Sequence, residues 1–244
     1  MNLIALIIAL LLPVVPSDKI PVGTVIPVML SSRLNAAKDK PDASIEGKIM
    51  QEITLPSGIK IREGARIQGH TVSVGREKSG SSIIVKFTAI QNEDQIIPVT
   101  TGVLAVASMA TVSDAQRPVG GNSDIDPDTQ WVTRQVGGDI VKRGWGQVFS
   151  SAGVTGKWVG GSSVVIKLTP NEAAGCSQGP GYDREQAVWI FSSAACGTYG
   201  FGNLKIANPG IGSPVGEITL ASTRNIDIRS GSGWLLIVAE ESSE

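Results

Sequence analysis

Residues that could do acid/base chemistry are scarce in this 244-residue chain, which has a single histidine, His70. A histidine that acts as a general base needs an oriented polar partner and a nearby nucleophile. Thr71 and Ser73 follow it, but the nearest acids along the sequence are Glu63 and Glu77. We therefore expect His70 to be a structural or surface residue.

A second pattern is that of a hydrolase. Residues 175–179 read Gly-Cys-Ser-Gln-Gly and match the G-x-S-x-G nucleophile elbow. The elbow needs a strand that turns into a helix and a histidine later in the chain, whereas Pro180 and Gly181 disfavour the helix and His70 precedes the serine.

The charged turn at 183–185 could supply glycosidase carboxylates. Neighbouring acids on a turn are usually solvated, so we predict that the protein is not an enzyme, with a hydrolase as the alternative.

Four oxygen-bearing side chains alternate like the ligands of a calcium loop: Asn122, Asp124, Asp126 and Asp128. Such a loop has a glycine at its sixth position and a bidentate acid at its twelfth. Counted from the first of these residues, the two positions hold Pro127 and Thr133. The four residues are therefore weak calcium candidates, and the simpler interpretation is a polar loop that precedes a helix. We expect no metal and no other cofactor.

Tryptophan is the better candidate for ligand binding, because an exposed indole can stack on a sugar or contact a partner protein. The chain has five: Trp131, Trp145, Trp158, Trp189 and Trp234. Trp189 and Trp234 lie within apolar runs and are expected in the core. Trp145 and Trp158, flanked by glycine and lysine, are the candidate ligand-binding residues.

The charge balance and the cysteines restrict the class of protein. Lysine plus arginine number 21 and aspartate plus glutamate 22, which excludes the basic surface of a nucleic-acid-binding domain. Cys176 and Cys196 are an even pair within one glycine-rich stretch. In an exported chain such a pair indicates one disulfide, and two free buried thiols are the alternative.

Segments rich in Val, Ile and Thr, with partial alternation, follow one another between turn signals. They cover 24–30, 45–55, 65–74, 83–90, 96–107, 164–168, 187–191, 216–220, 225–229 and 234–238. The 29 glycines also favour turns and bulges over long helices. We predict a mainly β fold, a barrel or sandwich of short antiparallel strands with one short helix.

The helix is expected to begin after Asp126, an N-cap followed by Pro127, and to stop at Gly137 and Gly138. Residues 18–112 would form a β-barrel-like domain and 113–130 a linker or long loop. Residues 131–244 would form a second β region that contains the disulfide. Whether this region completes the same barrel is left open by the sequence.

An apolar run near the start of the sequence, at 3–15, has the form of a signal-peptide h-region and is broken by Pro13. It is too short for a membrane-spanning helix, which needs about 20 apolar residues. We therefore expect residues 1–17 to be a signal peptide and the mature chain to be periplasmic or extracellular, with no transmembrane anchor after cleavage. A buried N-terminal strand or helix is the alternative.

One part of the chain resembles a known family. Residues 23–28 read Gly-Thr-Val-Ile-Pro-Val, and 61–66 read Ile-Arg-Glu-Gly-Ala-Arg with Gly69 following. With the strand at 45–53 between them, these motifs resemble the C-terminal β-barrel domain of TrbI-like components of conjugation and type IV secretion systems. That family has G-T-x-I-P and then I-P-x-G-A/S-x-x-x-G, and Arg62 replaces the second proline. The resemblance implies a barrel fold and a place in an envelope assembly.

A second resemblance covers the later part of the chain. The motifs Trp189, Phe191, 195–197 (Ala-Cys-Gly) and 199–201 (Tyr-Gly-Phe) are similar to those of uncharacterised exported bacterial proteins, and they imply no activity. We expect an exported, non-enzymatic β protein that acts through surface contacts, with an envelope protein or a cell-wall glycan as partner and no nucleic acid. The alternative is a carbohydrate or cell-wall binding module that uses Trp145 and Trp158. The sequence does not determine whether the chain forms homo-oligomers.

Overall fold

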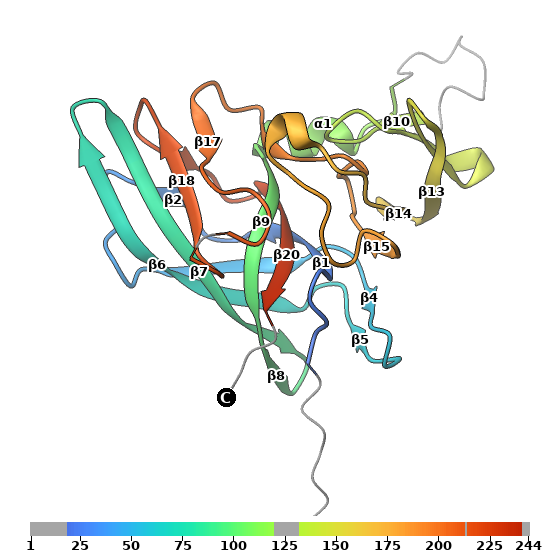
Figure 1. Cartoon of the computed structure of the whole chain (residues 1–244), viewed down its shortest axis with the longest axis horizontal. Helices are drawn as coiled ribbons and strands as arrows, with labels where there is room; N and C mark the ends of the chain where they lie inside the picture. The colour runs from blue at the N-terminus through green and yellow to red at the C-terminus, as the bar shows by residue number, and fades with distance from the viewer. Residues whose placement is uncertain (1–18, 120–131, 213, 241–244) are drawn as a thin grey trace, which may run out of the picture.

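A computed structural model describes residues 19–119, 132–212 and 214–240. The fold is mainly β, as predicted, and its strands form two sheets packed face to face with two short ribbons beside them (Figure 1). The expected signal peptide, at 1–17, and the four calcium candidates, at 122–128, lie outside the described residues. Trp131 also lies outside them.

The large sheet has ten strands in the order β16-β9-β20-β1-β3-β6-β7-β18-β17, with β8 paired to β7 beside this path. Its strands are β1 (Val25–Leu30), β3 (Ser44–Ile49), β6 (Arg66–Glu77), β7 (Gly80–Asn92), β8 (Gln95–Pro98), β9 (Thr100–Ala107), β16 (Gly197–Tyr199), β17 (Leu204–Ile206), β18 (Ile218–Ser222) and β20 (Gly233–Glu240). All neighbours are antiparallel except β16 and β9. The sheet thus combines strands from the 18–112 and 131–244 regions.

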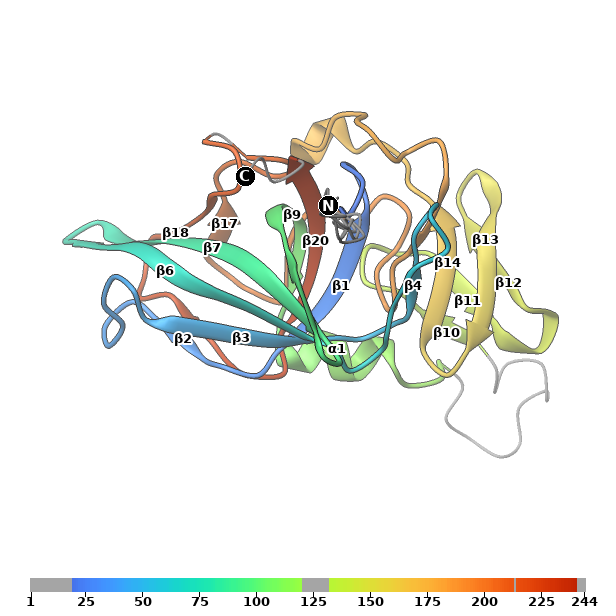
Figure 2. The same ribbon diagram turned by 90° about the horizontal axis from the view of Figure 1, so that it is seen from below.

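The large sheet curls around its own core (Figure 2). Its two end strands, β16 and β17, come into contact, but no hydrogen-bonded ladder joins them among the described residues. The sandwich prediction is confirmed, and the closed barrel is wrong for the part of the chain that the structure describes.

The small sheet has six antiparallel strands in sequence order. They are β10 (Val132–Arg134), β11 (Ile140–Lys142), β12 (Gln147–Ser150), β13 (Gly153–Gly160), β14 (Ser163–Lys167) and β15 (Glu185–Ala187). It packs against the central strands of the large sheet, so β1, β9 and β20 are buried on both faces. In β20, Trp234 and Leu236 face the core of the curled sheet, while Leu235 and Ile237 face the small sheet. This double burial explains why β20 is continuously apolar from Trp234 to Ala239.

The two tryptophans expected in the core are there. Trp234 is fully buried and meets Phe87 edge to face in the curled sheet, with 5.9 Å between ring centroids. Trp189 is 1% exposed and meets Phe191 at 6.4 Å between the two sheets. Each pair adds the favourable edge-to-face contact of aromatic rings to the burial of large apolar surfaces.

The helix lies elsewhere than expected. Helix α1 (Met109–Ala115) begins at the N-cap Ser108, whose hydroxyl accepts a hydrogen bond from the backbone N–H of Thr111 at 3.2 Å. The expected helix after Asp126 is wrong in its described part, because Val132–Arg134 is β10 and pairs with β11. The β-branched Val132 and Thr133 favour a strand. Pairing with β11, which lies outside the expected helix, outweighs the local capping signals.

The disulfide prediction is confirmed. Cys176 and Cys196 are bonded across 20 residues of sequence with their Cα atoms 6.1 Å apart. The bond joins the turn after the 3-10 helix η3 (Glu172–Ala174) to the segment that leads into β16. It therefore ties the end of the small sheet to the large one.

Buried glutamine side chains also join the sheets. Gln51, 3% exposed, accepts hydrogen bonds from the backbone N–H groups of Val164 and Trp189 at 3.1 and 2.7 Å and donates to the Val164 carbonyl at 2.9 Å. Trp189 has a φ of 53°, a left-handed conformation that is rare for a bulky residue. Its carbonyl accepts from Gln135 at 3.3 Å. Two amide side chains thus hold the peptide groups on either side of this bend.

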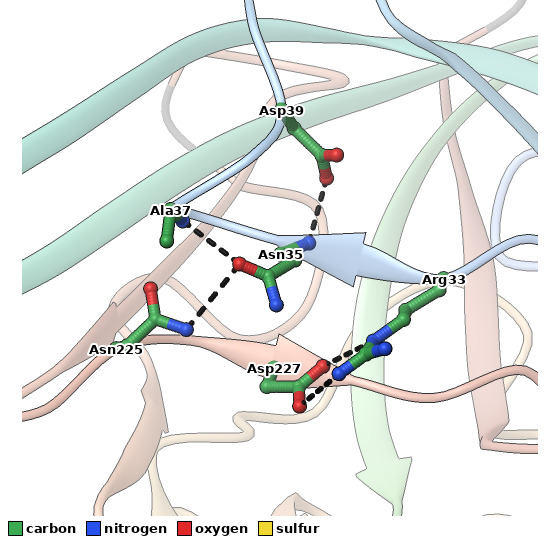
Figure 3. A network of polar contacts seen from close by, with 6 residues as sticks. All are labelled: Arg33, Asn35, Ala37, Asp39, Asn225 and Asp227. Atoms are coloured by element: carbon green, nitrogen blue, oxygen red, sulfur yellow. Dashed lines mark hydrogen bonds and ion pairs between the residues drawn. The ribbon is translucent and has the colours of Figure 1, made fainter.

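The short ribbons are β4 (Ile53–Thr54) with β5 (Lys60–Ile61), and β2 (Leu34–Asn35) with β19 (Asp227–Ile228). Figure 3 shows the polar network at the second ribbon. Arg33 donates from two nitrogens to the Asp227 carboxylate at 2.6 and 2.5 Å. The hydrogen bond and charge of Arg33 lower the pKa of Asp227, against an opposing effect of partial burial. Asp39 accepts from the Asn35 backbone N–H at 2.6 Å, so both carboxylates of the network have structural partners.

Candidate functional site

The register of the small sheet separates its two faces. One row of cross-strand partners runs through Thr133, Val141, Val148, Gly156, Ile166 and Gln186, and all of these except the half-buried Gly156 are buried. Cross-strand partners share a face, and successive residues of a strand point to opposite faces. The rows on either side of this one therefore point away from the large sheet, except at Ala187, which is buried in the core.

We call the exposed side of the small sheet the outer face. It consists of Val132, Arg134, Ile140, Lys142, Gln147, Phe149, Val154, Lys157, Val159, Val165, Lys167 and Glu185, with Trp145 at its margin. All of these side chains are half-buried or exposed. Val154 and Val159 are each 57% exposed and Trp145 is 60% exposed. They are three of the seven large apolar residues that are exposed in the described part of the chain, so this one face presents nearly half of them.

Trp145 closes the short 3-10 helix η2 (Arg143–Trp145), which connects β11 to β12. Gly146 follows with a φ of 67°, a left-handed turn that glycine adopts without strain. The Lys142 ammonium lies 4.2 Å from the centroid of the Trp145 ring and 4.9 Å from that of Phe149. Cation–π contacts of this kind hold the ammonium group between the two rings.

Trp158, the other candidate tryptophan, turns the opposite way. Its ring is half-buried against the core between the sheets, and its indole N–H donates to the Gly161 carbonyl at 3.0 Å. Its backbone N–H donates to the carbonyl of Gly146. The structure therefore brings the backbones of the two predicted residues together, but only Trp145 presents its ring to solvent.

The outer face carries an excess of positive charge. Arg134, Lys142, Lys157 and Lys167 lie on it against one acid, Glu185. A Lys157–Glu185 ion pair at 3.3 Å neutralises that acid. Because the whole chain has a formal net charge of −1, this excess is a local feature and does not follow from composition.

A cleft of about 310 Å³ adjoins the outer face where β14 and β15 meet the β4–β5 ribbon. Val165 and Glu185 line the cleft and also lie on the outer face. Inside the cleft, an Arg184 nitrogen donates to the hydroxyl of Thr24 at 3.0 Å, and Glu52 accepts from Lys60 at 2.7 Å. The carboxylates that line the cleft are thus engaged in ion pairs, and the walls of the cleft are a mixture of polar and apolar side chains.

The patterns that suggested catalysis are not assembled into a site. His70 lies on β6 between Ser44 and Lys86, next to a bulge at Gly69 where a Cβ atom would come within 2.2 Å of a backbone oxygen. The hydrolase-like segment 175–179 contains the disulfide-bonded Cys176, and no helix follows it. Over the described ranges, no three metal-binding side chains gather.

The comparisons with known proteins give no family. No protein-family model matches the chain, and no curated protein matches it significantly. None of the helices in the described ranges is both long and apolar enough to span a membrane.

The sequence signals for the outer face were incomplete. Trp145 could be singled out by its glycine and lysine neighbours, but Phe149, Val154 and Val159 could not, because valine and phenylalanine in a strand usually indicate the buried face. The register shift between Val148 and Phe149 breaks the alternation that would have separated the two faces.

Proposed function

We propose that this protein is an exported, non-enzymatic component of the cell envelope or exterior that acts through contacts of the outer face. The observation that carries the proposal is that one face of one sheet presents three exposed apolar side chains, Trp145, Val154 and Val159, among cationic residues. Exposed apolar groups that cluster, with polar residues around them, mark interaction sites.

Two further features support this placement. The Cys176–Cys196 disulfide fits an oxidising compartment outside the cytoplasm. The resemblance of residues 23–74 to the TrbI-like domain favours an envelope assembly as the setting. The non-enzymatic role is supported by the position of His70, which no described carboxylate contacts by hydrogen bond or ion pair.

A second candidate function is binding of a cell-wall glycan, and the exposed ring of Trp145 favours it. Lys142 covers this ring at 4.2 Å, so a sugar would stack on the opposite side of the indole. Trp158 would contribute through its backbone, which supports the Trp145 turn. Loss of glycan binding on Trp145→Ala, with binding retained in the Val154→Ser/Val159→Ser variant, would favour this candidate.

Cell fractionation of the native host tests the proposed function. The mature protein should begin near Asp18 and should be recovered with the envelope or outside the cell. The Val154→Ser/Val159→Ser variant should lose its association with envelope or exterior material, because it removes two of the three exposed large apolar groups of the outer face. The matched control is Ile96→Ser/Val215→Ser, which changes exposed apolar residues elsewhere. Equal recovery of both variants would contradict the proposed function.

A further inference from the structure

We propose that the outer face docks on an anionic lipid surface, with lysines contacting the headgroups and apolar side chains entering the interface. This inference rests on the proposed function and adds the chemical class of the partner. The proposed partner is a bilayer surface rich in anionic lipid. The charge of the outer face and its exposed apolar side chains support this assignment.

Charge complementarity is the first argument. Arg134, Lys142, Lys157 and Lys167 are spread over four strands of the outer face, and the only acid, Glu185, is already paired with Lys157. An anionic leaflet attracts such cations, each worth about 1 kcal/mol near the surface. The chain as a whole is slightly acidic, so the outer face would also orient the protein toward such a surface.

The apolar side chains supply the second argument. Trp145 lies at one end of β12, and Val154 lies near the other, where the β12–β13 hairpin turns. Val159 stands beside the β13–β14 turn. The exposed groups therefore extend across the face and do not surround a pocket. A bilayer surface can contact all of them at once, and indole rings favour the headgroup level of a membrane.

The composition of the outer face argues against other partners. Protein interfaces are depleted in lysine relative to the rest of the surface, whereas three of the four cations here are lysines. A glycan site places several hydrogen-bonding groups around the stacking ring. Near Trp145 the outer face offers mainly Lys142 and Gln147, and Lys142 is already held between two rings.

Vesicle flotation of the purified mature chain tests this proposal. The protein should float with phosphatidylcholine vesicles that contain phosphatidylglycerol, should not float with phosphatidylcholine alone, and should be released by high salt. The Lys142→Gln/Lys157→Gln/Lys167→Gln variant should bind on the order of 100-fold more weakly, since each cation contributes about fivefold. The matched control is Lys38→Gln/Lys40→Gln/Lys78→Gln, which removes the same charge from exposed turns and loops outside the small sheet and should bind within about fivefold of the parent protein.

Tryptophan fluorescence gives an independent readout. The difference between the parent protein and Trp145→Phe isolates the emission of Trp145, which should shift to shorter wavelength on anionic vesicles and remain unshifted on neutral ones. Circular dichroism and a thermal melt establish that each variant is folded.

Two results would overturn the lipid assignment. If the triple-lysine variant floats as well as its control, the outer face is not the docking surface. If neither kind of vesicle binds the protein, but native envelope material binds it and loses it on Val154→Ser/Val159→Ser, the partner is a protein or glycan. In the second case the lipid proposal fails while the proposed function stands.

Discussion

Replacing Gln51 with methionine tests how the two sheets are held together. Methionine keeps the volume of the side chain but removes the oxygen that accepts from the Val164 and Trp189 N–H groups at 3.1 and 2.7 Å. The Val164 carbonyl keeps a second donor, the Val188 N–H at 3.1 Å. Two buried N–H groups are then left without partners, at about 1–3 kcal/mol each. We expect the free energy of unfolding to fall by about 2–6 kcal/mol.

Urea denaturation, followed by circular dichroism and tryptophan fluorescence, measures this change. Gln68→Met is the control, because Gln68 is exposed on β6 and its replacement should change the free energy of unfolding by less than about 0.5 kcal/mol. Hydrogen exchange of the Val164 and Trp189 amides should accelerate in Gln51→Met before the large sheet opens. A loss below about 0.5 kcal/mol in Gln51→Met would refute the reasoning, because the two N–H groups would then be satisfied by other means.

Three further predictions concern the disulfide, the ion pair and the histidine. Replacing Cys176 and Cys196 together with alanine should lower the free energy of unfolding by about 3 kcal/mol, the loop-closure value for a 20-residue loop; an unchanged urea midpoint would contradict this. Because Arg33 lowers the pKa of Asp227, the pair stabilises the fold above the carboxyl's unfolded pKa, and this contribution is lost as the pH falls through the lower folded pKa. Asp227→Asn should therefore melt slightly below the parent protein at neutral pH and together with it in strong acid. His70→Gln should change any measured binding by less than about threefold, below 1 kcal/mol, and a loss of 100-fold or more in a defined activity, with folding intact, would reveal a missed catalytic centre.

The long strands and the disulfide could be predicted from sequence because their signals are local. Segments such as 24–30 and 83–90 alternate or are continuously apolar; the first contains β1, and the second lies within the longer β7. The disulfide could be predicted from an even number of cysteines and the expected export to an oxidising compartment. The tryptophans in apolar runs, Trp189 and Trp234, are buried as predicted.

The small sheet was harder to predict because its first strands depend on partners. Strands β10 and β11 have three residues each, too few to show a period. Capping signals at Asp126 and Gly137 favoured a helix there, but the pairing of Val132 with Lys142 favours a strand. The outer face could not be predicted for the same reason, since only the register shows that Val154 and Val159 lie away from the large sheet.

Lysine footprinting in the native envelope is the most direct test of the central claim, that the outer face makes the functional contact. An acylating reagent is applied to intact envelope or culture material and to the purified protein, and labelling at each lysine is compared by mass spectrometry. We predict that Lys157 and Lys167 are protected in the native material while Lys38 and Lys78, exposed outside the small sheet, are labelled equally in both. Equal labelling at all four lysines, or protection of Lys38 and Lys78 alone, would contradict it.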